Sequence, residues 1–319
     1  MERDVYFDNA RWLMITLVVF GHLIQPYQNM IVLQTSYTWI YTFHMPVFIF
    51  LAGFFAKGMG HKAAIEKLVK KLLLPYLFFQ VIYTMFYYAI GKEGWLQSVL
   101  IPQWALWFLL SLFCWHMLLI PFKYIRPLTG IPLAVLIGVA AGYVDTIGSE
   151  FSLSRTFVFF PFFLIGYWAT KDQLAVLRRM PIRFGAGFVL ISTAIVLYHF
   201  PNLSTGWLLG SKSFAEIGAD ESGGLIRILI YVISAVMMAS VLSLIPAKET
   251  PFSKYGQRTL YVYLLHGFAI QYIRAEDIFE VSNTLDILGL LFVTFSIVWV
   301  LSQRWILRIW KPLIELKSP

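Results

Sequence analysis

The sequence has few charged residues and a single cysteine. Asp, Glu, Lys and Arg make up 13% of its 319 residues, whereas soluble domains contain about 25%. The lone Cys114 excludes an internal disulfide framework. The histidines show no H-x-x-x-H or comparable spacing, so we expect no metal site. Any chemistry must therefore come from a small number of polar side chains.

Apolar residues fill most of the chain. They make up 59% of it, and the mean hydropathy is +0.72. Segments of about 20 apolar residues, each long enough to cross a bilayer, recur along the sequence. No small-x-small cleavage site follows the first of them, so we expect a retained span and not a signal peptide. We predict one domain, residues 1–319, that is an all-α polytopic membrane helix bundle of about ten transmembrane helices, at 10–30, 37–56, 72–90, 104–122, 131–147, 157–170, 184–200, 225–245, 259–274 and 285–307.

The basic residues alternate between successive connections of this bundle. With a cytoplasmic N-terminus, 20 of the 25 Lys and Arg fall in inner segments, and five lie on or near the other side: Lys92, Arg155, Lys212, Arg227 and Arg274. Lys and Arg set membrane orientation by the positive-inside rule. We therefore expect both termini to be cytoplasmic and the protein to lie in the cytoplasmic (plasma) membrane. The same rule explains the net charge of +8 without a nucleic-acid partner.

The ionisable groups expected at membrane depth are histidines, because no Asp or Glu falls inside the predicted hydrocarbon region. Arg11 and His22 are eleven residues apart, so on a helix they share one face, about 16 Å apart along the axis. His44 should lie level with His22 in the next span, and His266 is able to line the same cavity. An ionisable group at that depth is functional by default. The alternative is a buried histidine bonded to a carbonyl of a neighbouring helix, with Arg11 as a flanking anchor.

Histidine suits general acid–base chemistry at neutral pH. A serine-type triad cannot be assembled from the span residues, because it needs a buried acid. Lys67, Lys70 and Lys71 lie on about one helical turn before the third span. Together with Arg11 they could hold the phosphate groups of a donor. The positive-inside rule explains the position of any single lysine at least as well as phosphate binding does.

Six segments spread over nearly the whole chain resemble the membrane-bound acyltransferase-3 family, in particular its fucose 4-O-acetylase-like members. The first has an aspartate followed by a basic residue and a histidine with ten residues between them, here Asp8, Arg11 and His22. The others follow in the family's order: FHMPVFIFLAGFF at 43–55, KLVKKLLLPY at 67–76, WFLLSLF at 107–113, SRTFVFFPFFLIGYW at 154–168 and TLYVYLLHG at 259–267. Ala52 stands where many members have serine, so we assign no catalytic hydroxyl there. The basic cluster uses lysine where arginine is common, which weakens bidentate phosphate recognition.

The resemblance implies an O-acyltransferase that moves an acyl group, usually acetyl, from coenzyme A to a sugar hydroxyl. Acetyl-CoA would enter from the cytoplasm and meet a carbohydrate or lipid-linked glycan of the cell envelope inside the bundle. His22 is expected to act as general base or transient acyl carrier, assisted by His44. Arg11, oriented by Asp8, and the three lysines are expected to bind the donor phosphates.

On the acceptor side, Arg155 at the external start of the sixth span, His266 and Trp107 are expected to line the cavity. Gly53 and Gly166 are expected to allow close helix approach. A secondary transporter of a small solute or polysaccharide precursor is the main alternative, although inverted repeats and discontinuous helices are not clear in the sequence. A sensor or scaffold without chemistry is a third reading.

Overall fold

The computed structural model describes residues 4–57, 62–147, 150–201, 203–219 and 221–315, and within these ranges every regular element is a helix. The α-helices are α1 (Val5–Ile24), α2 (Ile31–Tyr41), α3 (His44–Phe54), α4 (Lys62–Leu68), α5 (Leu74–Ala89), α6 (Trp107–Phe122), α7 (Pro127–Ala141), α8 (Leu153–Trp168), α9 (Lys171–Leu177), α10 (Met180–His199), α11 (Gly206–Leu209), α12 (Phe214–Ile217), α13 (Gly223–Leu244), α14 (Thr259–Ala275), α15 (Thr284–Leu301) and α16 (Arg304–Ile314). Short 3₁₀ turns and one π turn, over Val69–Leu73, connect them: η1 (Gln25–Tyr27), η2 (Val69–Leu73), η3 (Trp104–Leu106), η4 (Glu150–Ser152) and η5 (Ser253–Arg258).

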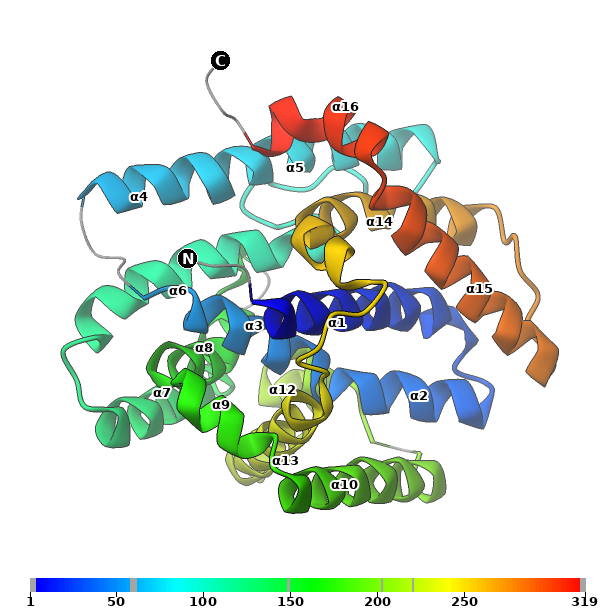
Figure 1. The fold of residues 1–319 in the computed structure, drawn as a ribbon. Coiled ribbons are helices and arrows are strands. Elements are labelled where there is room, and N and C mark those ends of the chain that lie inside the picture. Colours follow the sequence, from blue (N-terminus) through cyan, green and yellow to red (C-terminus); the bar gives the residue numbers. More distant parts are fainter. Residues whose placement is uncertain (1–3, 58–61, 148–149, 202, 220, 316–319) are drawn as a thin grey trace.

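Helix α1 runs through the middle of the bundle and packs against α2, α3, α14 and α15 (Figure 1). At its start, the Asp4 side chain accepts a hydrogen bond from the Tyr6 amide at 3.2 Å, which satisfies one of the free amides of the first turn. Ala10, Met14 and Val19 are completely buried. Because other helices surround α1, its polar side chains Asp8, Asn9 and Thr16 are buried within the protein.

Six helical stretches of the described residues are long and apolar enough to cross a membrane: Ile31–Phe54, Ile65–Ala89, Trp104–Phe122, Met180–His199, Gly223–Leu244 and Thr284–Leu301. Two shorter apolar helices, α7 and α8, accompany them. The protein is thus a multi-pass, all-helical membrane protein. The number of ten spans and the cytoplasmic position of both termini stay predictions.

The second predicted span, 37–56, coincides with most of the membrane-length stretch Ile31–Phe54, but the helix is interrupted inside it. α2 ends at Tyr41 and α3 begins at His44. Pro46 explains the break, because in a continuous helix its ring would clash with the carbonyl of Thr42, four residues earlier. The break brings the rings of Tyr41 and His44 to a centroid distance of 4.5 Å. The interruption therefore shapes the surroundings of a predicted site residue.

The first and last predicted spans also differ from the structure. α1 begins at Val5, so Asp8, which the prediction left outside the span, belongs to the helix and is buried. The last predicted span, 285–307, is wrong as one helix, because α15 ends at Leu301 and α16 begins at Arg304 at an angle to it (Figure 1). Basic residues and tryptophans alternate with aliphatic residues in α16. Such an amphipathic helix suits the membrane interface better than the hydrocarbon region.

Helices α3 and α8 pack closely because each has a glycine at the contact. A Cβ atom added at Gly53 would lie 2.0 Å from the carbonyl oxygen of Phe163 in α8. One added at Gly166 would lie 2.0 Å from the carbonyl oxygen of Phe50 in α3. Neither position leaves room for a side chain, so the expected close approach at both glycines is confirmed. This contact fixes the position of α3, which forms one wall of the site described below.

The long polar segment between α10 and α13 contains two short helices, α11 and α12, and is bound to the bundle at several points. The Ser154 hydroxyl donates to the Gly210 carbonyl at 2.8 Å. The buried Arg227 guanidinium donates to the Trp207 carbonyl at 2.7 Å. Residues 203–219, which we call the cover segment, therefore pack next to the start of α8, where Arg155 lies.

Candidate active site

A cavity of about 340 Å³ lies between α1, α3, α6 and α14. Arg11 and His22 both line it, so the two groups that share one face of α1 also share one cavity. Trp107 belongs to the lining as well. The other lining residues are mostly apolar: Ile15, Val18, Met45, Phe48, Leu51, Ala52, Phe55, Ala105, Phe108, Leu112, His116, Thr259, Leu260 and Tyr263.

His22 lies among aromatic rings. Its Nδ1 atom is 3.2 Å from the Tyr41 hydroxyl, and the two groups share a hydrogen bond. The Trp104 ring lies 4.5 Å from the imidazole, and the His266 ring stacks at 5.7 Å with an interplanar angle of 29°. The ring is therefore held at one nitrogen and across its faces, while its edge is accessible to the cavity.

The hydrogen-bond partner of His22 distinguishes it from the other buried histidines. The Nδ1 atoms of three of them bond to backbone carbonyls four residues earlier in the chain: His44 to Ile40 at 2.9 Å, His116 to Leu112 at 2.7 Å and His266 to Val262 at 3.0 Å. A structural histidine bonded to a carbonyl is thus an adequate description of those three and not of His22. His44 additionally satisfies a carbonyl next to the α2–α3 break.

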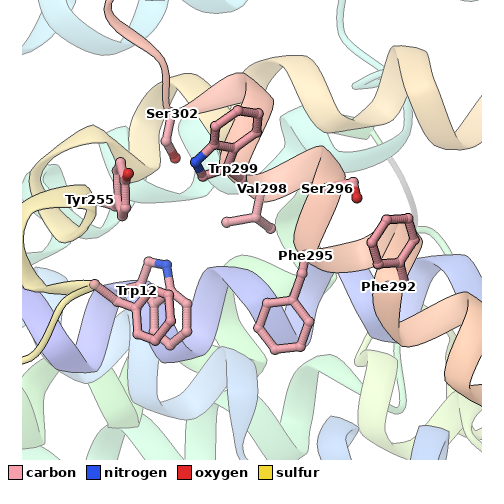
Figure 2. Close-up of a pocket in the computed structure, with 9 residues that line it drawn as sticks. Trp12, Tyr255, Phe292, Phe295, Ser296, Val298, Trp299 and Ser302 are labelled. Carbon is pink, nitrogen blue, oxygen red and sulfur yellow. The ribbon is translucent and has the colours of Figure 1, made fainter.

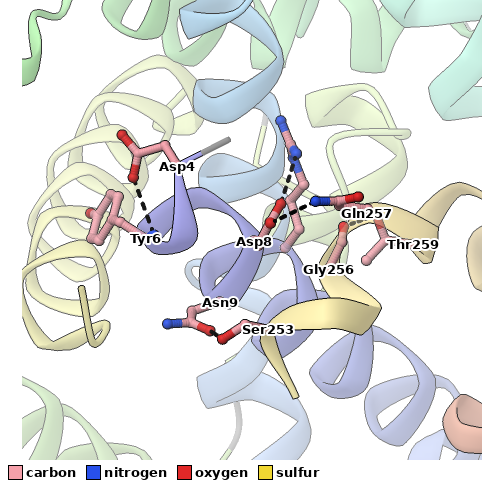
Figure 3. A network of polar contacts seen from close by, with 9 residues as sticks. Asp4, Tyr6, Asp8, Asn9, Ser253, Gly256, Gln257 and Thr259 are labelled. Carbon is pink, nitrogen blue, oxygen red and sulfur yellow. Dashed lines mark hydrogen bonds and ion pairs between the residues drawn. The ribbon is translucent and has the colours of Figure 1, made fainter. Parts of the chain in front are cut away.

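Arg11 is held at a second position along the cavity. Its guanidinium is 3.6 Å from the Asp8 carboxylate and lies 4.5 Å from the centre of the Phe55 ring. Asp8 in turn accepts a hydrogen bond from the Gln257 side chain at 3.1 Å (Figure 3). The Arg11 side chain is still 30% exposed. A cation that is oriented but accessible is suited to binding an anionic ligand.

The start of α1 is clamped to the segment before α14. The Asn9 side chain accepts a hydrogen bond from the Ser253 hydroxyl at 2.6 Å (Figure 3) and donates one to the Pro246 carbonyl at 2.8 Å. A Cβ atom added at Gly256 would lie 2.1 Å from the Asp8 carbonyl oxygen. Nothing in the sequence pairs Asn9 with Ser253, because 244 positions separate them. The clamp fixes the part of α1 that orients Arg11.

Two further arginines lie near His22. The Arg155 guanidinium is 4.9 Å from the centre of the Trp107 ring. Arg274 donates hydrogen bonds to the His22 carbonyl oxygen and, at 2.9 Å, to the Gln25 side chain. Both positive charges are close enough to act on the imidazole. Arg155 was expected near the acceptor, whereas Arg274 was counted only as an outer anchor.

Sequence reasoning missed Tyr41, Trp104 and Arg274 as partners of His22. Tyrosine and tryptophan near span ends usually lie in the interfacial belts, so neither residue type indicates a site by itself. One signal for Tyr41 was available, because it directly precedes the Pro46-containing motif that interrupts the second span. Trp104 and Arg274 reach His22 only through long-range packing.

The structure does not bring the three lysines to this cavity. Lys67, Lys70 and Lys71 are exposed on α4 and the π turn that follows it, and none of them lines the cavity. Their role in donor binding stays a prediction. In the part of the chain that the structure describes, no three His, Cys, Asp or Glu side chains are grouped so that they could hold a metal ion.

A second cavity, of about 350 Å³, lies on the flank of the bundle between α1, η5 and α15 (Figure 2). Its walls are aromatic, and Trp12 stacks on Phe252 with ring centroids 4.3 Å apart. Phe292 and Trp299 of α15 are largely exposed around it. Tyr255 supplies its only titratable side chain, so this groove lacks the groups that acyl transfer needs. The cavity between Arg11 and His22 is therefore the candidate active site.

Comparison with known proteins agrees with this chemistry. Residues 4–303 match the acyltransferase domain that defines the acyltransferase-3 family. Nodulation protein NolL of Mesorhizobium japonicum is 36% identical over 94 residues, which cover 24% of this chain and 23% of the relative. NolL of Sinorhizobium fredii is 36% identical over 85 residues, with the same two shares. The chain thus aligns with about a quarter of the length of these relatives, and no solved structure matches it. Because the family match extends over nearly the whole chain, the protein belongs to the acyltransferase-3 family.

Proposed function

We propose that the protein moves an acetyl group from acetyl-CoA to a hydroxyl of a cell-envelope or lipid-linked carbohydrate in the plasma membrane. The observation that supports this most strongly is the single cavity lined by both Arg11 and His22. It offers a cation for the donor phosphates and, about three helical turns away, an imidazole for proton transfer. A transporter requires neither group, and membership of an acyltransferase family favours the enzyme.

The donor would lie along this cavity. Coenzyme A has its phosphates at one end and its thiol at the other, joined by a long flexible arm. Arg11 would form charge-assisted hydrogen bonds to a phosphate, and apolar walls such as Phe48 and Leu51 would contact the arm. The small Ala52 side chain leaves this path open. The three lysines outside the cavity would add only long-range attraction at its entrance.

His22 would act as the general base. As the acceptor hydroxyl oxygen attacks the thioester carbonyl, His22 takes the hydroxyl proton. The C–S bond then breaks, and the departing sulfur of coenzyme A receives that proton. Acid–base participation of this kind is typically worth about 100- to 10,000-fold in rate. Arg155 and Trp107 would contact the acceptor, while His44 and His266 would support the site through their packing around Tyr41 and His22.

Tyr41 would place the free nitrogen of His22 toward the reaction. Tyr37 stacks on Tyr41 with ring centroids 4.0 Å apart, beside the hydroxyl that bonds to His22. A tyrosine hydroxyl has one proton to donate. If Tyr41 donates it to Tyr37, the Nδ1–H of His22 donates to Tyr41, and Nε2 is unprotonated. This is the tautomer that a general base at Nε2 requires.

Direct transfer is preferred over a covalent acyl-histidine. Within the described residues no carboxylate is hydrogen-bonded to His22, and direct attack by a positioned hydroxyl needs only a base. We expect purified protein mixed with labelled acetyl-CoA, without acceptor, to retain no stoichiometric label. Label that is retained on the parent protein and absent from His22→Ala would establish the covalent route with ping-pong kinetics instead.

Replacing Arg11 by glutamine is expected to weaken acetyl-CoA binding by about tenfold or more, because a hydrogen bond to a charged group is lost. Equilibrium binding of labelled acetyl-CoA to purified protein measures this. The double variant Lys67→Gln/Lys70→Gln is the comparison, and a smaller decrease in affinity is expected for it because both lysines lie outside the cavity. If the Arg11 variant binds acetyl-CoA as tightly as the parent protein, Arg11 does not bind the donor and serves as a membrane anchor.

Replacing Tyr41 by phenylalanine is expected to lower kcat by about three- to tenfold, the cost of one neutral hydrogen bond. The KM for acetyl-CoA should be unchanged, because Arg11 and the cavity walls remain. Steady-state kinetics separate the two parameters. Tyr37→Phe keeps the stacking and the Tyr41 hydroxyl, so a smaller effect is expected. Equal changes in kcat and KM would indicate a packing role for Tyr41.

Membranes containing the protein, incubated with labelled acetyl-CoA, test the proposed function as a whole. We expect label in the extracted envelope glycan or lipid-linked glycan. Alkali should release this label as acetate. Membranes with His22→Ala should give none. Solute uptake that depends on an ion gradient, without label transfer, would contradict the proposal.

A further inference from the structure

A group of polar side chains lies next to His22, beyond the end of α1 that is away from Arg11. We name it the α14 cluster: Gln25, Tyr87, Lys92, Gln271 and Arg274. Arg274 bonds to the His22 carbonyl and to Gln25. The Lys92 ammonium donates to Gln271 at 3.1 Å and lies 4.0 Å from the centre of the Tyr87 ring. Three separate parts of the chain thus contribute hydrogen-bonding groups to this cluster, and Arg274 connects it to the backbone of the proposed base.

Two members of the α14 cluster have buried polar atoms without a partner in the described structure. They are the hydroxyl of Tyr87, whose side chain is 1% exposed, and the Nε atom of Arg274. Arg274 is close enough to Tyr87 to act on it electrostatically. Buried donors that lack a partner cost free energy and call for an explanation such as a bound ligand.

The cluster also has unbalanced positive charge. Neither Lys92 nor Arg274 forms an ion pair with a carboxylate among the residues that the structure describes. Asp277, three residues after Arg274, is exposed and follows the end of α14. Burial, and after it the charge of Arg274, lower the pKa of Lys92. Two cations that act electrostatically on each other, beside the buried Tyr87 hydroxyl, form a favourable place for an oxyanion.

We infer that the α14 cluster binds an oxyanion of the acceptor, a phosphate or a carboxylate on or next to the sugar that receives the acyl group. The inference rests on the proposed function and specifies its acceptor class. Arg274 and Lys92 bind the anion, and the Tyr87 hydroxyl donates to it. Because Arg274 also bonds to the backbone of His22, an anion there places a neighbouring hydroxyl near the imidazole. The donor phosphates, at Arg11, lie toward the opposite end of α1.

Binding of three small probes to purified protein in detergent tests the inference without requiring transfer. The probes are labelled glucose, glucose 1-phosphate and glucuronate, and saturating coenzyme A keeps anions out of the donor cavity. At least one charged probe is expected to bind about tenfold or more tightly than glucose. Preference for glucose 1-phosphate identifies a phosphate site, and preference for glucuronate a carboxylate site. Equal affinity for all three probes, or no saturable binding, would overturn the inference.

Variants locate the binding to the cluster. Lys92→Gln and Tyr87→Phe are each expected to weaken the preferred charged probe by about three- to tenfold and to leave glucose unchanged. Lys212→Gln, at an exposed lysine of the cover segment, is the matched control and should bind like the parent. Charged-probe binding that survives both cluster variants would contradict the assignment.

His22→Ala separates this inference from the proposed function, because it should abolish transfer and retain probe binding. If the parent protein binds the charged probes selectively but transfers no acyl group, the oxyanion site is supported and the proposed acyltransferase function is wrong. Transfer that proceeds equally to neutral and charged acceptors would leave the function valid and overturn the site.

Discussion

Replacing His22 by alanine should reduce acyl transfer by about 100- to 10,000-fold, the usual contribution of a general base. The protein should still fold and bind acetyl-CoA, because Arg11 and most of the cavity wall are unchanged. The expectation depends on the one imidazole that lines the cavity and bonds to a side chain, at Tyr41, and not to a backbone carbonyl. Initial rates with purified, folded variants measure the effect.

His116 provides a matched comparison for that experiment. It lines the same cavity, but its Nδ1 atom bonds to the Leu112 carbonyl of its own helix. His116→Ala should therefore lower the rate by less than tenfold. A loss below tenfold in folded His22→Ala, or a larger loss in His116→Ala, would exclude His22 as the general base.

Replacing Gly166 by alanine should lower the stability markedly although it adds a single methyl group. The new Cβ atom would lie 2.0 Å from the Phe50 carbonyl oxygen, so α3 and α8 would have to move apart. Overpacking of this kind costs about 1–3 kcal/mol, and more where the backbone itself must shift. Each kcal/mol lowers Tm by about 2–4 °C in a protein of 150–250 residues, so a decrease of several degrees is expected in detergent.

Gly187 is the control for that substitution. It lies in the middle of α10, and an added Cβ atom there would meet nothing within 4 Å. Gly187→Ala should leave Tm unchanged or raise it, because alanine favours a helix more than glycine does. Equal effects of the two substitutions would show that helix propensity, and not the α3–α8 contact, sets the result.

The sequence was sufficient to predict the features that depend on local spacing. The alignment of Arg11 with His22 follows from helix periodicity alone. Gly53 and Gly166 could be named in advance because small residues allow helices to approach. The all-helical membrane class followed from composition. In each case a property of a single segment determines the result.

Other features depend on contacts between distant segments and could not be predicted. Arg274 meets the His22 carbonyl across 252 positions, and Asn9 meets Ser253 across 244. The α2–α3 break had a local cause in Pro46, which hydropathy averaged over a span conceals. Tyr41 is the last residue before that break, and its contact with His22 joins positions that are 19 residues apart.

Cysteine protection tests most directly the central claim that the acyl donor lies in the cavity between Arg11 and His22. Ala52 lines this cavity, and Ser296 lines the aromatic groove on the flank of the bundle. Ala52→Cys and Ser296→Cys would each be introduced in a Cys114→Ser background and labelled with a maleimide. Saturating acetyl-CoA is expected to slow labelling of the Ala52→Cys protein severalfold and to leave the Ser296→Cys protein unaffected. Unchanged labelling at Ala52→Cys, with acetyl-CoA bound, would contradict the account.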